Sequence, residues 1–281
     1  MNTTQTAPLA INRLNIHQVT LNQCNFRESI ECLSRHGIRE TAVWLPRLEE
    51  TGVAEAGRIL RDNGIVATSV CAGGLLTSAG NAEGSIVLDR NRRWLEQAAE
   101  IGATSMVTIT GGLPEGVRDL DSMRAQALER LAALIPDARS AGVRLALEPL
   151  HPIVCGFRSV ISTLGEALDA LGQLESDDVM GIAFDSYALW WEVSLEEKIR
   201  RTAPHLLCVH VSDWLQDTSD VRLDRGMPGD GLIDNRRIRG WLEQAGFSGS
   251  IEVEIFSERN WWKRPPDEVV ETIIDRSRQH L

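Results

Sequence analysis

The segment LALEPL, residues 145–150, ends an apolar run with a single acidic side chain, Glu148. Three later segments have the same form, in which strand-forming apolar residues lead to one side chain that can bind a metal ion. They are GIAFDSY (181–187) with Asp185, LLCVHVSDW (206–214) with His210, and SIEVEIF (250–256) with Glu254. This repetition predicts four strands of one parallel sheet, each with a polar side chain near the same end.

The rest of the chain continues this alternation of short apolar runs and longer amphipathic stretches. Eight apolar runs predict strands, at residues 14–21, 40–45, 65–73, 104–112, 143–150, 180–187, 206–214 and 250–256. Residues 123–143 form a clear helical stretch, with apolar side chains at three- and four-residue steps at Leu128, Leu131, Leu134 and Ile135. Glycines that suit left-handed helix caps precede several strands: Gly37, Gly64, Gly102, Gly142 and Gly246. Eight such units over about 250 residues predict an α/β fold, the (β/α)₈ TIM barrel.

Composition narrows the class of protein. With 281 residues and no linker or low-complexity segment, we expect a single barrel domain at residues 13–281 after a flexible lead at residues 1–12. A net charge of -11 disfavours a nucleic-acid groove. No apolar run long enough to span a bilayer occurs, so we expect no membrane association. The five cysteines are scattered, without a CxxC pair, which favours reduced thiols in a cytoplasmic protein. A homo-oligomer remains possible.

The four polar side chains predict a metal centre. The carboxyl ends of barrel strands converge on one rim, so Glu148, Asp185, His210 and Glu254 should surround one point. Three carboxylates and an imidazole suit Mn²⁺, Co²⁺ or Mg²⁺, with Zn²⁺ also possible. A divalent ion there can bind two adjacent oxygens of a keto-sugar and stabilise the enediolate formed when a C–H proton leaves. Glu148 and Glu254 would act as base and acid. The alternative for each residue alone is a helix cap or an ion pair with arginine.

Five segments resemble the sugar phosphate isomerase/epimerase superfamily, the xylose isomerase-like TIM barrels that include tagatose and psicose 3-epimerases and inosose dehydratases. They are ALEPLHP (146–152), FDSYALWW (184–191), HVSDW (210–214), DRGMPGDG (224–231) and EVEIFSERNWW (252–262). The resemblance implies a metal bound by Glu148, Asp185, His210 and Glu254, with the two glutamates also the catalytic pair. It implies that Arg225 contacts substrate oxygens, the alternative being an ion pair with Asp224 or Asp230.

Other substrate contacts are predicted around this centre. Asp213 follows the His210 strand, and Trp191 could stack on a sugar ring. His151 is a candidate for substrate binding, although a bond to nearby backbone is an equal alternative. The long segment from Gln216 to Asp234 is expected to cover the site as a lid.

One position departs from the family pattern. Relatives usually carry histidine three residues after the metal-binding aspartate, where this chain has Ala188. His151 could supply the missing hydrogen-bond donor, or the reaction could differ. We therefore expect a metal-dependent epimerase or isomerase of a keto-sugar or related polyol ketone, the alternative being a lyase that eliminates a β-leaving group from a keto-sugar, oxidised glycoside or inosose. A DNA-repair endonuclease would need a basic groove and more histidines, and a sugar sensor would not need both glutamates.

Overall fold

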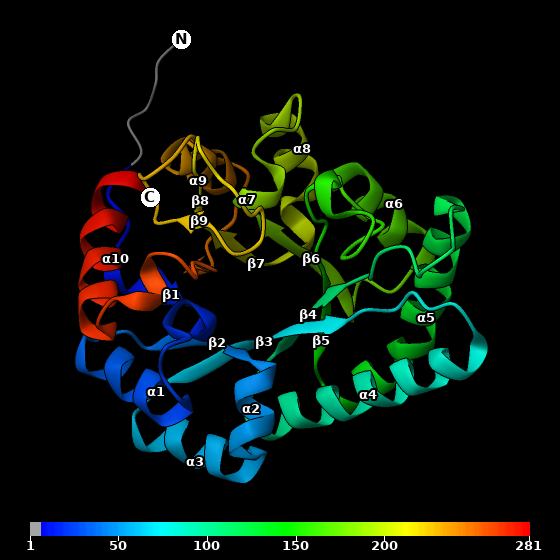
Figure 1. Cartoon of the computed structure of the whole chain (residues 1–281), viewed down its shortest axis with the longest axis horizontal. Helices are drawn as coiled ribbons and strands as arrows, with labels where there is room; N and C mark the ends of the chain where they lie inside the picture. The colour runs from blue at the N-terminus through cyan, green and yellow to red at the C-terminus, as the bar shows by residue number, and fades with distance from the viewer. Residues whose placement is uncertain (1–6) are drawn as a thin grey trace.

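The computed structural model of the protein describes residues 7–281, and its centre is a parallel barrel surrounded by helices (Figure 1). Eight strands pair in the order β1-β10-β7-β6-β5-β4-β3-β2. They are β1 (Leu14–Ile16), β2 (Glu40–Trp44), β3 (Val66–Gly74), β4 (Ser105–Ile109), β5 (Arg144–Leu147), β6 (Met180–Asp185), β7 (Leu206–Val211) and β10 (Ile251–Val253). A short antiparallel pair, β8 (Asp213–Trp214) and β9 (Arg225–Gly226), lies in the segment between β7 and β10. The predicted (β/α)₈ barrel is confirmed.

Ten α-helices occur among residues 7–281, and most connect consecutive barrel strands. They are α1 (Phe26–Arg35), α2 (Leu45–Thr51), α3 (Val53–Asp62), α4 (Asn81–Glu100), α5 (Leu120–Ala141), α6 (Leu164–Leu174), α7 (Ser186–Leu189), α8 (Leu195–Thr202), α9 (Asn235–Gln244) and α10 (Pro266–His280). The five glycines predicted as left-handed caps all have positive φ, between 62° and 97°. In α5, Leu131, Leu134 and Ile135 are buried, and Leu128 packs at the edge of the same core.

The first strand is shorter than the predicted run at residues 14–21. It ends at Ile16, because the side chain of His17 accepts a hydrogen bond from the backbone N–H of Val19 and begins the 3₁₀ helix η2 (Gln18–Leu21). The predicted lead falls partly outside the described residues, which begin at residue 7. Its last part includes the 3₁₀ turn η1 (Ile11–Arg13), and the domain boundary stays a prediction.

The barrel closes between its first two strands through side chains. No strand ladder joins β1 to β2 in the described part of the chain. Instead, Thr41 Oγ1 donates to the carbonyl of Ile16 at 2.7 Å, and Gln18 Oε1 accepts from the backbone N–H of Trp44 at 3.0 Å. Two buried side chains therefore complete the ring of strands.

The barrel interior holds small and polar side chains. Because strand residues alternate between faces, positions two apart point the same way. A small apolar cluster of Cys71, Val107, Ala146 and Ala183 lies inside, while the large apolar residues pack between strands and helices. Ala146 and Ala183 are followed two positions later by Glu148 and Asp185, so this alternation directs both acids inward. No helix of residues 7–281 combines the length and hydropathy needed to cross a membrane.

Candidate functional site

The four predicted metal ligands lie near the carboxyl ends of four barrel strands. Glu148 directly follows β5, Asp185 is the last residue of β6, His210 is in β7, and Glu254 directly follows β10. All four side chains are buried. The fold therefore assembles residues that are more than 100 positions apart at the extremes of the set.

Three of the four form a compact donor set. Ligand atoms of Glu148, His210 and Glu254 all lie within 4.8 Å of one another. His210 Nδ1 is 2.9 Å from Glu148 Oε1. Two carboxylates and one imidazole suit a divalent ion, and their burial leaves them without the water that would otherwise compensate their charge. The residues present therefore fit the metal that the fold family implies.

Asp185 is held apart from this trio by Arg225. Arg225 Nη1 donates to Asp185 Oδ2 at 3.2 Å and to Glu254 Oε2 at 2.8 Å. The guanidinium lies over the Tyr187 ring, 4.4 Å from its centroid, and 5.1 Å from that of Phe256. Arg225 thus pairs with two predicted metal ligands, and not with Asp224 or Asp230.

The pKa values of Glu254 and Asp185 shift in opposite directions. Burial disfavours the charged form of Glu254, but the nearby cations, Arg225 above all, lower the pKa of its carboxyl to about 2. For Asp185, burial outweighs the effect of Arg225 and raises its pKa to about 7. Glu254 is therefore a carboxylate at neutral pH, as a proton acceptor must be.

Glu252 is a buried acid beside His210 that was not among the predicted site residues. It lies two residues before Glu254 on β10, and its Oε1 is 3.3 Å from His210 Nε2. Burial raises the pKa of Glu252 to about 8. Burial opposes a charged His210, yet Glu252, with contributions from Cys208 and Glu148, raises the pKa of that imidazole well above its ordinary value. The segment EVE (252–254) could have indicated Glu252, because residues two apart in a strand face the same side and Glu254 faces inward.

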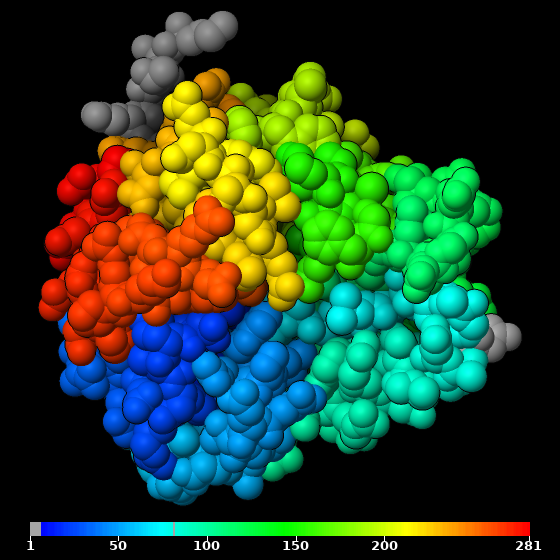
Figure 2. Space-filling model, viewed as in Figure 1, coloured from blue at the N-terminus to red at the C-terminus, as the bar shows by residue number. Residues whose placement is uncertain are grey.

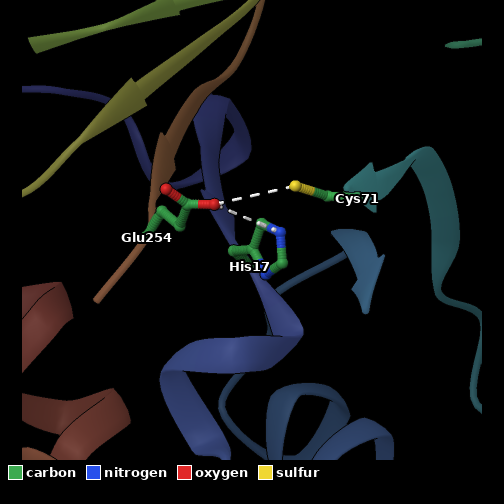
Figure 3. A group of neighbouring side chains, drawn as sticks. All are labelled: His17, Cys71 and Glu254. Carbon is green, nitrogen blue, oxygen red and sulfur yellow. Dashed lines mark hydrogen bonds and ion pairs between the residues drawn. The ribbon is translucent and has the colours of Figure 1, made fainter. Parts of the chain in front are cut away.

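A second group shares Glu254 (Figure 3). His17, after β1, and Cys71, in β3, point toward the Glu254 carboxylate, with Nε2 at 3.5 Å and Sγ at 3.8 Å from Oε1. Val19 N–H donates to His17 Nδ1 at 3.0 Å, so the neutral ring carries its proton on Nε2. Burial lowers the pKa of His17 to about 4. His17 is thus a neutral donor directed at Glu254, and it offers no free lone pair to a metal.

A cavity opens onto this centre. Its wall includes Glu148, Glu254 and Arg225 together with aromatic and basic residues: Trp44, His151, Arg158, Tyr187, Trp214, Arg222 and Phe256. Ala188 also lines the cavity, at the position where the family resemblance predicts histidine. His151 is both on the wall and bonded to backbone, because its Nδ1 accepts from the N–H of Ile153 at 3.2 Å. The bond to nearby backbone is therefore present, and a substrate contact of His151 stays a prediction.

Two predicted substrate contacts lie elsewhere. Trp191 is outside the cavity wall, and its Nε1 donates to the carbonyl of Ala188 at 2.6 Å. The wall has Trp214 instead, stacked on Tyr187 with ring centroids 4.8 Å apart. Asp213 is fully buried, and its carboxylate accepts from the backbone N–H groups of Trp214, Gly229 and Ile233. Asp213 supports the loop and does not line the cavity. No pattern in the sequence distinguished Trp214 from Trp191.

The segment between β7 and α9 forms one side of the cavity. Val221, Arg222 and Arg225 come from it, and on the face seen in Figure 2 this segment, in yellow, lies against the green segment near residue 155 and the orange one near residue 260. Position 231 has no room for a side chain, since a Cβ added to Gly231 would lie 2.2 Å from the carbonyl oxygen of Trp214. The loop is therefore packed tightly against the barrel through DRGMPGDG.

The family model described as xylose isomerase-like TIM barrel matches residues 29–280. The chain belongs to this family.

Individual relatives agree with that assignment. An inosose isomerase of Bacillus licheniformis is 28% identical over 160 residues, which span 54% of each chain, so this match covers about half of the relative. One of Bacillus velezensis is 22% identical over 90% of this chain and 91% of the relative. The crystal structure of protein SMc04130 from Sinorhizobium meliloti 1021 superposes with a TM-score of 0.93 at 42% identity, covering 96% of this chain and 99% of the other. The IolI protein, solved with a bound zinc atom, has a TM-score of 0.81 at 18% identity, covering 96% and 99%.

Proposed function

We propose that this family member is a divalent-metal-dependent isomerase or epimerase of a keto-sugar or a related polyol ketone. The observation that carries the proposal is the buried trio Glu148, His210 and Glu254, whose ligand atoms lie within 4.8 Å beside a cavity lined by both glutamates. The inosose isomerase relatives support a cyclic polyol ketone among the candidate substrates. The zinc in the IolI protein keeps Zn²⁺ beside Mn²⁺, Co²⁺ and Mg²⁺ as candidate ions.

The two glutamates provide the proton transfers. Glu254, held as a carboxylate by Arg225, accepts the proton from the carbon next to the substrate carbonyl, and the C–H electron pair becomes the double bond of an enediolate. Glu148, from a different strand, returns a proton to the same carbon from the other face or to the neighbouring carbon. The first outcome is epimerisation, and the second is isomerisation.

Arg225 and His17 orient the carboxylate of Glu254, the proton acceptor. Arg225 donates to Glu254 Oε2, while His17 Nε2–H faces Oε1, so each carboxylate oxygen lies next to a different donor. A bound ion would supply Lewis-acid polarisation of the carbonyl, and Glu148, His210 and Glu254 would hold it, with Asp185 joining if Arg225 turned to the substrate.

A lyase on the same scaffold is the second candidate, because Ala188 lines the cavity at the position where the family resemblance predicts histidine. Without that donor, the same enediolate can expel a β-leaving group. Incubation of the purified protein with ketoses and inososes in D₂O distinguishes the two reactions. NMR and mass spectrometry should show a deuterated isomer of unchanged formula, whereas loss of water or of an aglycone would establish the lyase.

Matched variants test the roles of the glutamates. Glu254→Gln and Glu148→Gln should each lower deuterium incorporation at least 100-fold, since each removes one proton-transfer group. Glu243→Gln, on α9, is the control and should exchange deuterium normally. Full exchange in either site variant would refute the two-glutamate mechanism.

A further inference from the structure

Two arginines on the cavity wall lack a partner. Arg158 lies in the segment after β5, and Arg222 lies in the segment between β8 and β9. Within residues 7–281, neither guanidinium has a hydrogen bond or an ion pair. Arg225, the third arginine of the same wall, is bonded to two carboxylates. Among the described residues, the two cations therefore have no directly paired counter-ion, and Glu148 acts on Arg158 only through space.

The backbone fixes Arg158 at the wall. Its N–H donates to the carbonyl of Val154 at 2.8 Å, and its carbonyl accepts from Gly111 at 3.0 Å. The N–H of Leu150 donates to the carbonyl of Ile161 at 3.1 Å and closes the segment that carries Arg158. A long cationic side chain is thus presented to the cavity from an anchored loop.

Electrostatics make this arrangement unfavourable without a ligand. Burial, and then the like charge of Arg222, lower the pKa of Arg158. The Asp220 carboxylate accepts the backbone N–H groups of Arg222 and Leu223 at 2.8 and 3.0 Å, so it attracts the Arg222 guanidinium through space without forming an ion pair with it. An anion in the cavity would relieve the repulsion between the two guanidinium groups.

We propose that Arg158 and Arg222 form an anion subsite, and that the substrate carries a carboxylate or phosphate beside its ketone. Guanidinium groups bind both anions through paired N–H donors. Glu148 and Glu254 are buried, whereas Arg222 is exposed, so the anionic group lies on the solvent side of the reacting carbons. This inference rests on the proposed function and narrows its substrate to acidic or phosphorylated keto-sugars.

Three probes test the subsite in the metal-loaded protein by calorimetric titration: D-fructose, 2-keto-D-gluconate and D-fructose 6-phosphate. At least one anionic probe should bind 10-fold or more tightly than D-fructose, and the preferred one shows whether the group is a carboxylate or a phosphate. Arg158→Gln and Arg222→Gln should each remove most of that advantage while leaving D-fructose binding unchanged. Arg158→Lys should keep part of it.

Controls separate this inference from the function on which it rests. Arg201→Gln, exposed on α8, should bind all three probes as the parent does, and thermal unfolding reports whether each variant is folded. Equal or absent binding of both anionic probes, or unchanged anion binding in both glutamine variants, overturns the subsite. Deuterium exchange measured on the same probes reports on the isomerase proposal alone, because it depends on Glu148 and Glu254.

Discussion

His210 shows how a single residue links metal binding to stability. Its imidazole is fully buried between Glu148, 2.9 Å from Nδ1, and Glu252, 3.3 Å from Nε2. Its raised pKa means that the metal-free protein favours the cationic ring, whose charge lies beside the Glu148 carboxylate and the Glu252 carboxyl group. A divalent ion would take over that charge and displace the proton.

We therefore expect His210→Ala to lose the bound metal and to destabilise the metal-free protein by about 3 kcal/mol, because breaking a buried ion pair leaves uncompensated charge. Elemental analysis and urea unfolding with a chelator measure the two effects. His205→Ala, at the start of the same strand region, is the control and should retain metal and stability. Stoichiometric metal in the His210 variant would contradict the proposed centre.

Cys71 is a thiol whose surroundings suppress its reactivity. It is 2% exposed, and burial together with the Glu254 carboxylate raises its pKa well above the ordinary value. The thiolate is the reactive form of cysteine. Native protein treated with iodoacetamide at pH 8 should therefore remain unmodified at Cys71, while the partly exposed Cys155 is alkylated. Peptide mass spectrometry measures both, and alkylation of Cys71 first would show that the site opens readily.

At the scale of elements, the short strands β8 and β9 carry Arg225 to the centre. Their pairing depends on Asp213, whose two carboxylate oxygens accept three backbone N–H groups at 2.9 Å each. Those donors come from β8 and from both sides of Gly231. One buried acid thus determines the path of the loop that forms the cavity wall.

Asp213→Ala should destabilise the protein by about 2 kcal/mol, since it leaves buried N–H groups without an acceptor. It should also make the segment 216–223 more sensitive to proteolysis and lower kcat more than it lowers metal content. Asp217→Ala, exposed in the same loop, is the matched control. Limited proteolysis and metal analysis test this expectation, and a variant as resistant as the parent would show that other contacts hold the loop.

At the scale of the whole molecule, the first and last α-helices of the described residues, α1 and α10, contact each other. Asp267, near the start of α10, accepts from Arg35 Nη2 at 2.8 and 3.1 Å and lies 2.8 Å from His36 Nε2, both residues at the end of α1. Arg35 and His36 lower the pKa of Asp267 to about 2. The contact therefore closes the helical layer next to the seam between β1 and β2.

The pH dependence follows from the direction of that shift. A carboxyl whose pKa is depressed in the folded state stabilises the protein above its unfolded pKa of about 4, and this stabilisation is lost as pH falls through about 2. Asp267→Asn should lower the stability by less than about 1 kcal/mol at pH 6, since the pair is half exposed. The difference from the parent should shrink as pH falls from 4 toward 2. Asp275→Asn, exposed on the same helix, is the control in thermal unfolding, and a difference that grew with acidity would contradict this explanation.

The sequence by itself determined the barrel and the acids at its rim. Alternating strand and helix patterns and capping glycines such as Gly142 are local signals, and Glu148 and Glu254 were visible because strand periodicity alone assigns their face. These features depend on near neighbours in the chain. The predicted ligand set could therefore be named before any distance was known.

Only the tertiary structure decided which of those groups touch. Arg225 lies between Asp185 and Glu254, Trp214 and not Trp191 lines the cavity, and Asp213 supports a loop. Such choices depend on how distant segments pack, which no local pattern encodes. The same holds for Arg158 and Arg222: the sequence shows that both arginines are present, but only the packing shows that neither guanidinium forms an ion pair with a carboxylate of residues 7–281.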